Sequence, residues 1–341
     1  MSSLPLYEAA NIFSTSGFVA TVFLNLTFIF LTIFHTKRID TTYKELLIVF
    51  SILCLIFSFI EMLVHPFFHS FNGGLINFNM VKWKWLSEEL ITFIVVSYSG
   101  LYATIVSFFT VMFLFRYWIM MSSPLVGFFK GWKLIILISW SVVFGVFGGG
   151  TVLYCGWIDD YSHDYMRDVM LKEYNLDVDH VSGYTVIAYD QNGNLRWKSL
   201  AVTLCLMFVM GTQFLIVGIC GFRMHFKMNE LLKNLSEAHR KLQKQFFMSL
   251  VLQITSPTLT FYIPAVLILT VPFLNLEWSF PTGVIVCSFS IYPPIDSLIL
   301  MLIVPEYRNA IKAIFKRPST ILNPKTTNRS STVFSQRNEV V

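Results

Sequence analysis

Seven long apolar stretches constrain the fold of this chain more than any other feature. The hydrocarbon core of a bilayer is about 30 Å thick, and a helix needs about 20 apolar residues to cross it. In the whole chain 55% of the residues are hydrophobic and 13% are charged, against about 25% charged in an ordinary soluble domain. The sequence therefore predicts an all-α membrane protein, a bundle of seven transmembrane helices. The predicted spans are residues 11–34, 46–64, 90–115, 134–156, 199–222, 246–271 and 281–304.

Lysine and arginine are distributed unevenly over the connections between these spans. Nineteen of the 25 lie in one set of alternate connections, which includes the C-terminus, and six lie in the other set. Cytoplasmic connections are enriched in both residue types, so we expect residues 1–10 outside the cell and the C-terminus in the cytosol. The outer connections then include a long loop, 157–198, and the inner ones a basic loop, 223–245. The net charge of +5 is explained by anionic membrane lipid and gives no reason to expect nucleic acid.

The outer halves of the second and third spans contain candidate ligand-binding residues. Glu61 is an intramembrane carboxylate, and such groups are costly enough in lipid to be functional candidates. The alternative is that Glu61 reaches the membrane surface or pairs with His65, one helical turn further on. Tyr98 and Tyr102 are four residues apart and share a helix face. They are candidates for ligand contact, with packing or an interfacial position as the alternative.

The sixth and seventh spans both contain proline, which removes an intrahelical hydrogen bond and bends a helix. Pro264 is expected to kink the sixth span, and Tyr262 beside it is a further candidate for ligand contact. In the seventh span, Pro293 and Pro294 precede Asp296, a carboxylate that must face the bundle or trapped water. We expect a polar hinge that repacks on activation, and a static, hydrated kink is the alternative.

The chain becomes amphipathic after the last apolar stretch. In residues 305–317 apolar side chains such as Ile311 and Phe315 fall opposite basic ones at helical spacing, which predicts a short helix on the inner leaflet. Residues 318–341 are rich in Ser, Thr, Asn and Pro, which predicts a disordered cytoplasmic tail.

The long outer loop combines acidic residues with a turn signal at Asn192-Gly193. We expect a hairpin there that covers the outer mouth of the bundle. The carboxylates match no EF-hand spacing, so we interpret them as a solvated acidic surface. A calcium-binding site is the more specific alternative. His163 and His180 lack a fixed metal partner. The motifs of nucleotide-binding, metalloprotease, hydrolase and dithiol redox sites are absent from the sequence, so we expect neither an enzyme nor a metal or other cofactor.

Gly145 and Gly149 in the fourth span are spaced as Gly-x-x-x-Gly. Small residues at this spacing let helices approach closely in lipid, which favours close packing inside the bundle. The motif is also compatible with a homo-oligomer, on weaker grounds. No cysteine lies in residues 65–100, so the disulfide that ties the third helix to the second outer loop in many seven-helix receptors is not expected.

Four blocks of the sequence carry a family resemblance. They are TYK…FS…E…P..H within Thr42–His69, Arg116-Tyr117, LQKQFFMSLVLQ at Leu242–Gln253, and YPPID…YR from Tyr292 to Arg308. The chain resembles the nematode seven-transmembrane chemoreceptors of the Str family, which includes the diacetyl-type odorant receptors, and is similar to the Srj group. The resemblance implies a receptor-like bundle, a small odorant as ligand, a heterotrimeric G protein as partner, and the ciliary membrane of a chemosensory neuron as location.

The resemblance also implies roles near the inner ends of the helices. Arg116-Tyr117 looks like the counterpart of the acidic-Arg-Tyr motif of rhodopsin-like receptors, with Phe115 in place of the acid. The block at the seventh span is similar to the family's Tyr-Pro-x-x-Asp-Pro, with Ser297 in place of the second proline. The residues of the expected conformational switch are Arg116, Tyr117, Pro264, Tyr292, Pro293, Asp296, Tyr307 and Arg308.

Two functions from different classes follow. The first is a chemosensory receptor in which a small, mostly apolar external ligand binds among the outer halves of the helices and favours a state that activates a cytosolic G protein. The alternative is a transporter or ligand-gated channel with Glu61, Arg116 and Asp296 along an ion path, although no internal repeat is seen between the halves. A receptor-like structural or trafficking partner is a third possibility.

Overall fold

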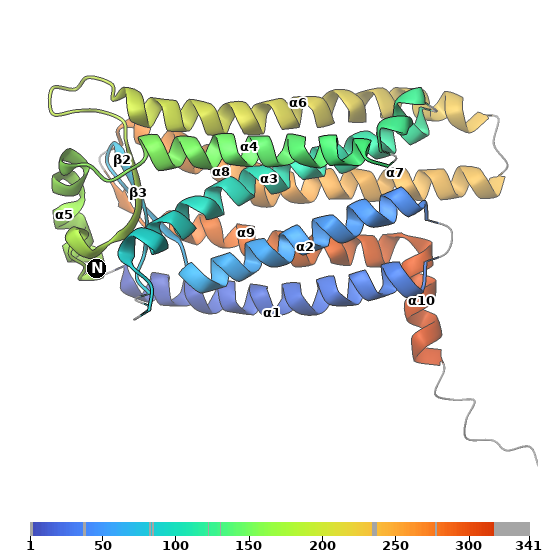
Figure 1. Cartoon of the computed structure of the whole chain (residues 1–341), viewed down its shortest axis with the longest axis horizontal. Coiled ribbons are helices and arrows are strands. Elements are labelled where there is room, and N and C mark those ends of the chain that lie inside the picture. The colour runs from blue at the N-terminus through green and yellow to red at the C-terminus, as the bar shows by residue number, and fades with distance from the viewer. Residues whose placement is uncertain are drawn as a thin grey trace, which may run out of the picture.

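Seven membrane-length helical spans lie side by side in the computed structural model of the chain (Figure 1). The structure describes residues 3–36, 39–81, 83, 85–121, 123–129, 131–233, 237–276 and 278–316. The spans are α1 (Leu4–Phe34), α2 (Thr41–Val64), α3 (Glu88–Met120), α4 (Lys133–Cys155), α6 (Trp197–Lys233), a composite sixth span, and α9 (Gly283–Ile303). The prediction of an all-α bundle of seven spans is confirmed, while the predicted tail, 318–341, lies outside the described residues.

The sixth span is built from several helical segments in succession. They are α7 (Glu237–Pro257), a π-helical turn (Thr258–Tyr262), α8 (Ile263–Thr270) and a 3₁₀ turn (Val271–Leu274). Beyond the seventh span, α10 (Pro305–Lys316) is the amphipathic helix expected after the last apolar stretch, and it leaves the bundle at an angle (Figure 1). Shorter 3₁₀ segments cover Pro124–Phe129 and Val178–His180.

The helix limits follow local sequence signals, and five spans are longer than predicted. Asp40 and Ser87 cap α2 and α3 by accepting hydrogen bonds from the backbone amides of Tyr43 and Leu90. The first helix begins at Leu4, with proline at its first turn, so most of the predicted outer segment 1–10 is helical. The fifth span continues into the helix-prone inner loop as far as Lys233.

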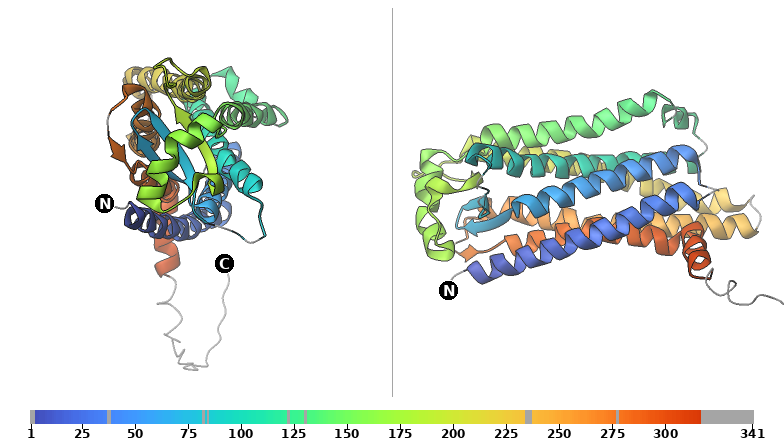
Figure 2. Two further views of the ribbon diagram at one scale, coloured as in Figure 1. Left: turned by 90° about the vertical axis from the view of Figure 1, so that its left-hand side faces the viewer. Right: turned by 60° about the horizontal axis from the view of Figure 1, so that its bottom comes forward.

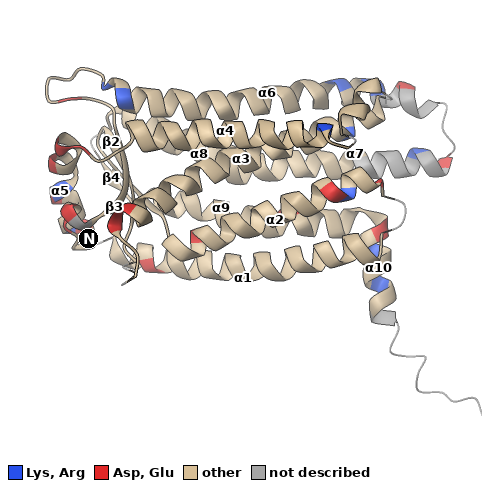
Figure 3. Cartoon of the chain, viewed as in Figure 1, with Lys and Arg blue, Asp and Glu red and all other residues tan. Residues whose placement is uncertain are grey.

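Charged side chains gather at the two ends of the bundle and are scarce along its middle (Figure 3). Large apolar side chains such as Phe23 and Val146 are exposed along the helices, as a lipid-facing surface requires. The end that contains the N-terminus is called the outer end here, and the end that contains α10 is called the inner end.

A four-stranded antiparallel sheet lies at the outer end, where only a hairpin around Asn192-Gly193 was predicted. Its strands are β1 (Phe67–Phe71), β2 (Gly74–Asn79), β3 (Ser182–Ile187) and β4 (Ser279–Phe280), in the order β3-β2-β1-β4. The predicted turn at Asn192-Gly193 is present, with backbone hydrogen bonds across it, but the strand before it, β3, pairs with β2 from the first outer loop. Around that turn the ladder is reduced to one bridge, between Tyr189 and Leu195.

Helix α5 (Asp160–Tyr174) lies across this sheet and covers the outer end of the bundle (Figure 2). A second hydrophobic core fills the space between α5, the sheet and the start of α1, separate from the core among the spans. Its buried members are Tyr7, Ala10, Phe67, Ile76, Phe78, Met166, Val169, Met170, Tyr174, Val178 and Ile187. The four strands and α5 together are called the outer cap.

A buried histidine joins the layers of the outer cap. His69 of β1 is within hydrogen-bond distance of the Tyr174 hydroxyl of α5, at 2.8 Å, and of the Ser279 hydroxyl of β4, at 2.9 Å. Burial lowers the pKa of His69 to about 4, although the nearby Glu173 carboxylate acts in the opposite direction. The imidazole is therefore neutral in the closed cap at neutral pH.

The histidine predicts how the cap responds to acid. In an opened cap His69 regains an ordinary pKa near 6.5, so its contribution to cap stability is full above pH 6.5 and falls as the pH drops toward 4. Amide hydrogen exchange of β1 and α5, corrected for intrinsic rates, should show weaker protection at pH 5 than at pH 7. His69→Gln should flatten this dependence, and the control His225→Gln, at an exposed position of α6 far from the cap, should not; equal protection of the native cap at both pH values would contradict the prediction.

The Gly-x-x-x-Gly motif of the fourth span packs inside the bundle. A Cβ atom built on Gly145 would lie 1.9 Å from Thr104 Oγ1 and 2.9 Å from the carbonyl oxygen of Gly100 in α3. A Cβ on Gly149 would lie 3.1 Å from the Gly100 Cα. The prediction of close internal packing is confirmed, because only glycine lets α3 and α4 approach this far.

The contact with α3 predicts opposite effects of alanine at Gly145 and at Gly150, which are five residues apart on α4. Gly145→Ala should destabilise the bundle by about 1–3 kcal/mol, because the methyl group overlaps α3. Gly150→Ala is the matched control, since open space surrounds a Cβ there and alanine favours a helix by about 1 kcal/mol. Thermal unfolding of the purified variants should place Gly145→Ala below the native protein and Gly150→Ala level with it or above; the reverse order would contradict this packing.

Candidate ligand cavity and signalling site

A small cavity lies in the outer half of the bundle beneath the outer cap. Its volume is about 60 Å³, and its walls come from α3, α6, α8 and α9. Phe68 of β1 and Tyr184 of β3 form its roof. The other lining residues are Tyr98, Ser99, Tyr102, Ala103, Leu206, Val209, Met210, Ala265, Ile268, Leu269 and Phe289. The structure thus brings two predicted ligand residues, Tyr98 and Tyr102, to one cavity.

The two tyrosines make different contacts although they share a helix face. Tyr102 donates a hydrogen bond of 3.2 Å to the carbonyl oxygen of Phe261, and its ring stacks on Phe289 with centroids 5.2 Å apart. Tyr98 stacks on Phe57 of α2 at 4.7 Å. Its hydroxyl is buried and has no hydrogen-bond partner among the described residues. Tyr102 therefore connects the cavity to the sixth span, while Tyr98 retains unused hydrogen-bonding capacity.

The other two predicted ligand residues lie outside this cavity. Tyr262 packs against Phe214 of α6, with ring centroids 5.4 Å apart, on a different side of the sixth span. Glu61 lies in a separate, smaller pocket and accepts a hydrogen bond from the Ser290 hydroxyl of α9. Its predicted alternative partner, His65, is joined to it through the backbone, with the His65 amide 2.8 Å from the Glu61 carbonyl oxygen.

Pro264 explains an unusual contact of the sixth span. Proline has no N–H group, so the carbonyl of Thr260, four residues earlier, loses its helical donor. The Ser288 hydroxyl of α9 replaces that donor at 2.9 Å, and it shares its proton with the Ile285 carbonyl of its own helix at 2.8 Å. Just before the proline, the helix widens into the π turn Thr258–Tyr262. The expected irregularity at Pro264 is present, and Ser288, which the sequence did not single out, holds it.

Phe261 is the second residue that the sequence analysis missed. Its ring contacts Tyr102 at 4.9 Å, Phe289 at 5.1 Å and Tyr292 at 4.5 Å between centroids. It therefore connects the floor of the cavity with the seventh span. An aromatic residue three positions before a proline was the available signal, but such residues are too common in this chain to stand out.

Asp296 is the centre of a buried polar chain in the inner half. The helix α9 continues through Pro293 and Pro294 without interruption, and Asp296 behind them is buried. Gln253 of α7 donates to the Asp296 carboxyl at 3.4 Å and accepts a hydrogen bond of 2.9 Å from Arg116. Three helices are joined by these contacts. The predicted repacking of this region on activation stays a prediction.

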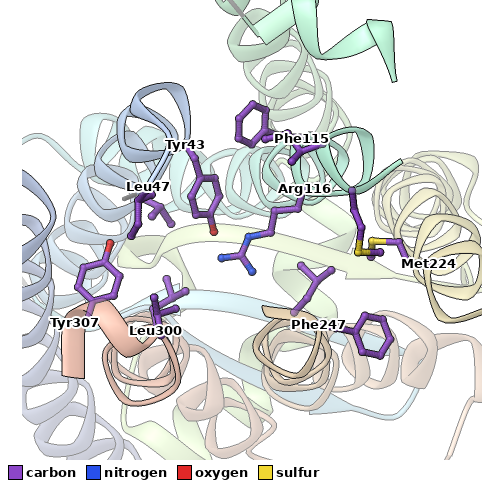
Figure 4. A pocket seen from close by; sticks show the side chains of 13 residues that line it. Tyr43, Leu47, Phe115, Arg116, Met224, Phe247, Leu300 and Tyr307 are labelled. Carbon is purple, nitrogen blue, oxygen red and sulfur yellow. The ribbon is translucent and has the colours of Figure 1, made fainter. Parts of the chain in front are cut away.

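Arg116 also borders a larger cavity at the inner end, of about 190 Å³ (Figure 4). Its guanidinium lies 4.6 Å from the centre of the Tyr43 ring, and the Phe115 ring stacks on the same tyrosine with centroids 5.7 Å apart. The remaining lining residues are Ile39, Leu47, Ile119, Met120, Met224, Phe247, Leu250, Leu300, Val304 and Tyr307. The cavity is thus apolar except for one guanidinium and two phenols.

Of the other predicted switch residues, Tyr307 lines this inner cavity, while Tyr117, Tyr292 and Arg308 do not. Tyr307 is fully buried, and its hydroxyl lies 2.9 Å from the Thr32 hydroxyl of α1. Tyr117 is partly buried against the core and does not line the cavity. Arg308 is exposed on α10. Tyr292 is buried between Phe50 and Phe261.

The proposed ion path receives no support from this arrangement. Glu61 lies near the outer end, while Arg116 and Asp296 lie in the inner network. Between the two sites the core is filled by contacting aromatic rings, those of Phe57, Phe261, Phe289 and Tyr292.

The sequence matches the family described as serpentine type 7TM GPCR chemoreceptor Str over residues 10–312. The chain belongs to this family. The G-protein coupled receptor str-33 of Caenorhabditis elegans is 36% identical over 316 residues, which cover 91% of this chain and 92% of that receptor. Serpentine receptor class r-10 of Caenorhabditis briggsae is 27% identical over 340 residues, 96% of each chain. The resemblance drawn from the four sequence blocks is confirmed.

The fold is also similar to a solved receptor structure. The crystal structure of squid rhodopsin matches with a TM-score of 0.60 and 17% identity, covering 91% of this chain and 85% of that one. At this identity the match shows the fold. Together with the Str family it makes the chain a G-protein-coupled chemoreceptor and a multi-pass membrane protein, and a transporter or channel is not favoured. The relatives named above are receptors.

The contact between Ser288 and the proline-freed carbonyl can be tested by a double-mutant cycle. Ser288→Ala leaves the Thr260 carbonyl without a donor in the native background, which should cost about 1–3 kcal/mol. In Pro264→Ala the new amide at position 264 can bond to that carbonyl, so Ser288→Ala should cost much less there. Thermal unfolding of the four proteins measures the difference; equal costs in both backgrounds would show that Ser288 does not replace the missing donor.

Proposed function

We propose that the chain detects a small, mostly apolar odorant in the cavity beneath the outer cap. The observation that carries the proposal is the double role of Tyr102, which lines this cavity and donates a hydrogen bond to the Phe261 carbonyl in the π turn. A ligand shifts a conformational equilibrium only through different affinities for two states. A ligand that contacts Tyr102 meets a side chain attached to the irregular segment of the sixth span.

The size of the cavity limits the ligand. An engineered cavity of roughly 150 Å³ in another protein holds benzene, and the cavity here measures about 60 Å³. A molecule smaller than benzene fits into the described conformation, and a larger one must displace side chains such as Phe289 or Met210. Repacking of the cavity is thus part of binding for all but the smallest ligands.

A continuous set of contacts leads from the cavity to the inner end. Phe261 touches Tyr102 above and Tyr292 below. One helical turn after Tyr292, Asp296 is joined through Gln253 to Arg116 at the inner cavity. In the proposed active state the inner ends of the fifth and sixth spans separate, and a heterotrimeric G protein binds there. Direct packing supports this route, because coupling requires elements that both sites can bias.

The proposed orientation places the N-terminus and the outer cap outside the cell. The excess of Lys and Arg in the inner connections and at the C-terminal end supports it. Acidic residues mark α5, and basic residues mark α10 (Figure 3). By its likeness to the Str family, the cilium of a chemosensory neuron is the proposed location.

Filling the cavity tests the ligand site. Ala265→Leu adds three carbon atoms to a wall of the cavity, and potency for an identified odorant should fall at least tenfold in cells that report a second messenger. Val266→Leu is the matched control, because this neighbour faces the lipid and should leave potency unchanged. An N-terminal tag stained in intact cells compares surface levels and reports the orientation. Unchanged potency in Ala265→Leu at normal surface level would contradict the site.

A further inference from the structure

A second, polar pocket lies between the outer ends of three spans. It has a volume of about 20 Å³ and is bordered by α1, α2 and α9 and the start of β1. It shares no lining residue with the ligand cavity. Its lining residues are Ala10, Asn11, Ser14, Glu61, His65, Pro66, Phe67, Gly283, Val286, Cys287 and Ser290. A cavity of this size holds one water-sized particle.

Glu61 brings a carboxylate to this pocket without a basic partner. Its side chain is only 5% exposed, and no Lys or Arg is among the residues that line the pocket. Burial lowers the pKa of His65, so this imidazole is neutral near pH 7 and supplies no positive charge. An isolated charge in this position is costly, and a counter-ion or a proton must offset it.

Besides the His65 imidazole and the Cys287 thiol, the polar groups that line the pocket with Glu61 carry oxygen atoms. Ser290 donates a hydrogen bond to it from α9. The Ser14 hydroxyl of α1 lies beside it, buried, and makes no hydrogen bond of normal geometry among the described residues. Asn11 adds an amide one helical turn earlier. Each of the three spans thus contributes an oxygen atom to one small space.

The pocket is held open by close helix packing. A Cβ atom built on Gly17 would lie 3.0 Å from the Ser290 Cβ and 3.1 Å from the Ser290 carbonyl oxygen, so α1 and α9 meet one turn below the pocket. This contact fixes the spacing of the two helices that place Ser14 and Ser290 beside the carboxylate. The site is therefore formed by the fold and does not need a ligand to assemble it.

The geometry points to a single sodium ion held by Glu61, Ser14, Ser290 and Asn11. Hard cations take carboxylate, hydroxyl and carbonyl oxygens, which are the groups present. One carboxylate balances one positive charge, and calcium needs six to eight oxygen ligands, more than this space accommodates. No observation behind this sodium site depends on the proposed odorant function, so the site would stand if that function failed.

Thermal unfolding of the purified full chain tests the site, with sodium chloride exchanged for choline chloride at constant ionic strength. Binding to the folded state should raise the unfolding temperature with increasing sodium until it saturates. Glu61→Gln should abolish this rise, and Ser14→Ala should move half-saturation to several-fold higher sodium. The controls are Glu8→Gln and Ser16→Ala, which change exposed groups of α1 and should behave as the native chain does.

Two outcomes would overturn the assignment. The first is an unfolding temperature of the native chain that is the same in sodium and choline, which would mean a protonated carboxyl beside water only. The second is a sodium-dependent rise that survives in Glu61→Gln. If Glu61→Gln fails to fold, the comparison of Ser14→Ala with Ser16→Ala decides, because an equal sodium dependence in that pair also contradicts the site.

Discussion

Inside a membrane every polar group of the backbone needs a partner within the protein, and the arrangement of this bundle depends on how that requirement is met at Pro264. The proline leaves the Thr260 carbonyl without a helical donor, and Ser288 of α9 supplies one. Nearby, Tyr102 of α3 donates to the Phe261 carbonyl. The sixth span is thus joined to α9 and to α3 at its π turn, Thr258–Tyr262. This turn also lies at the floor of the ligand cavity.

The same requirement explains the inner half, where a buried carboxylate and a guanidinium are joined through an amide. Gln253 lies between Asp296 and Arg116 and bonds to both. With Phe115 where rhodopsin-like receptors have an acid, the aromatic ring of Tyr43 and the amide of Gln253 take over the contacts of the guanidinium. The amide bonds to both groups without a tight ion pair between them, and Arg116 Nη2 is left without a hydrogen-bond partner among the described residues. Rearranging these groups therefore costs less than separating buried opposite charges.

Hydropathy was enough to predict the seven spans, because their length and apolar content follow from the thickness of the bilayer. The outer cap was beyond such reasoning: β2 pairs with β3 more than 100 residues later, and neither strand carries information about that register. Tyr98 and Tyr102 reach one cavity because a regular helix preserves spacing. Tyr262 does not, since the π turn changes the number of residues per turn and rotates the faces of the sixth span.

The short segment of α9 before its two prolines contacts the sixth span, the ligand cavity and the polar pocket. Ser288 supports the sixth span, Phe289 borders the ligand cavity, and Ser290 bonds to Glu61 in the polar pocket. Pro293 and Pro294 lack the amides that would bond to the carbonyls of Phe289 and Ser290, so the helix is held less tightly there than elsewhere. A shift of this segment would change both pockets together. If occupancy of one site shifts the segment, affinity at the other changes, and by thermodynamic linkage the effect is mutual.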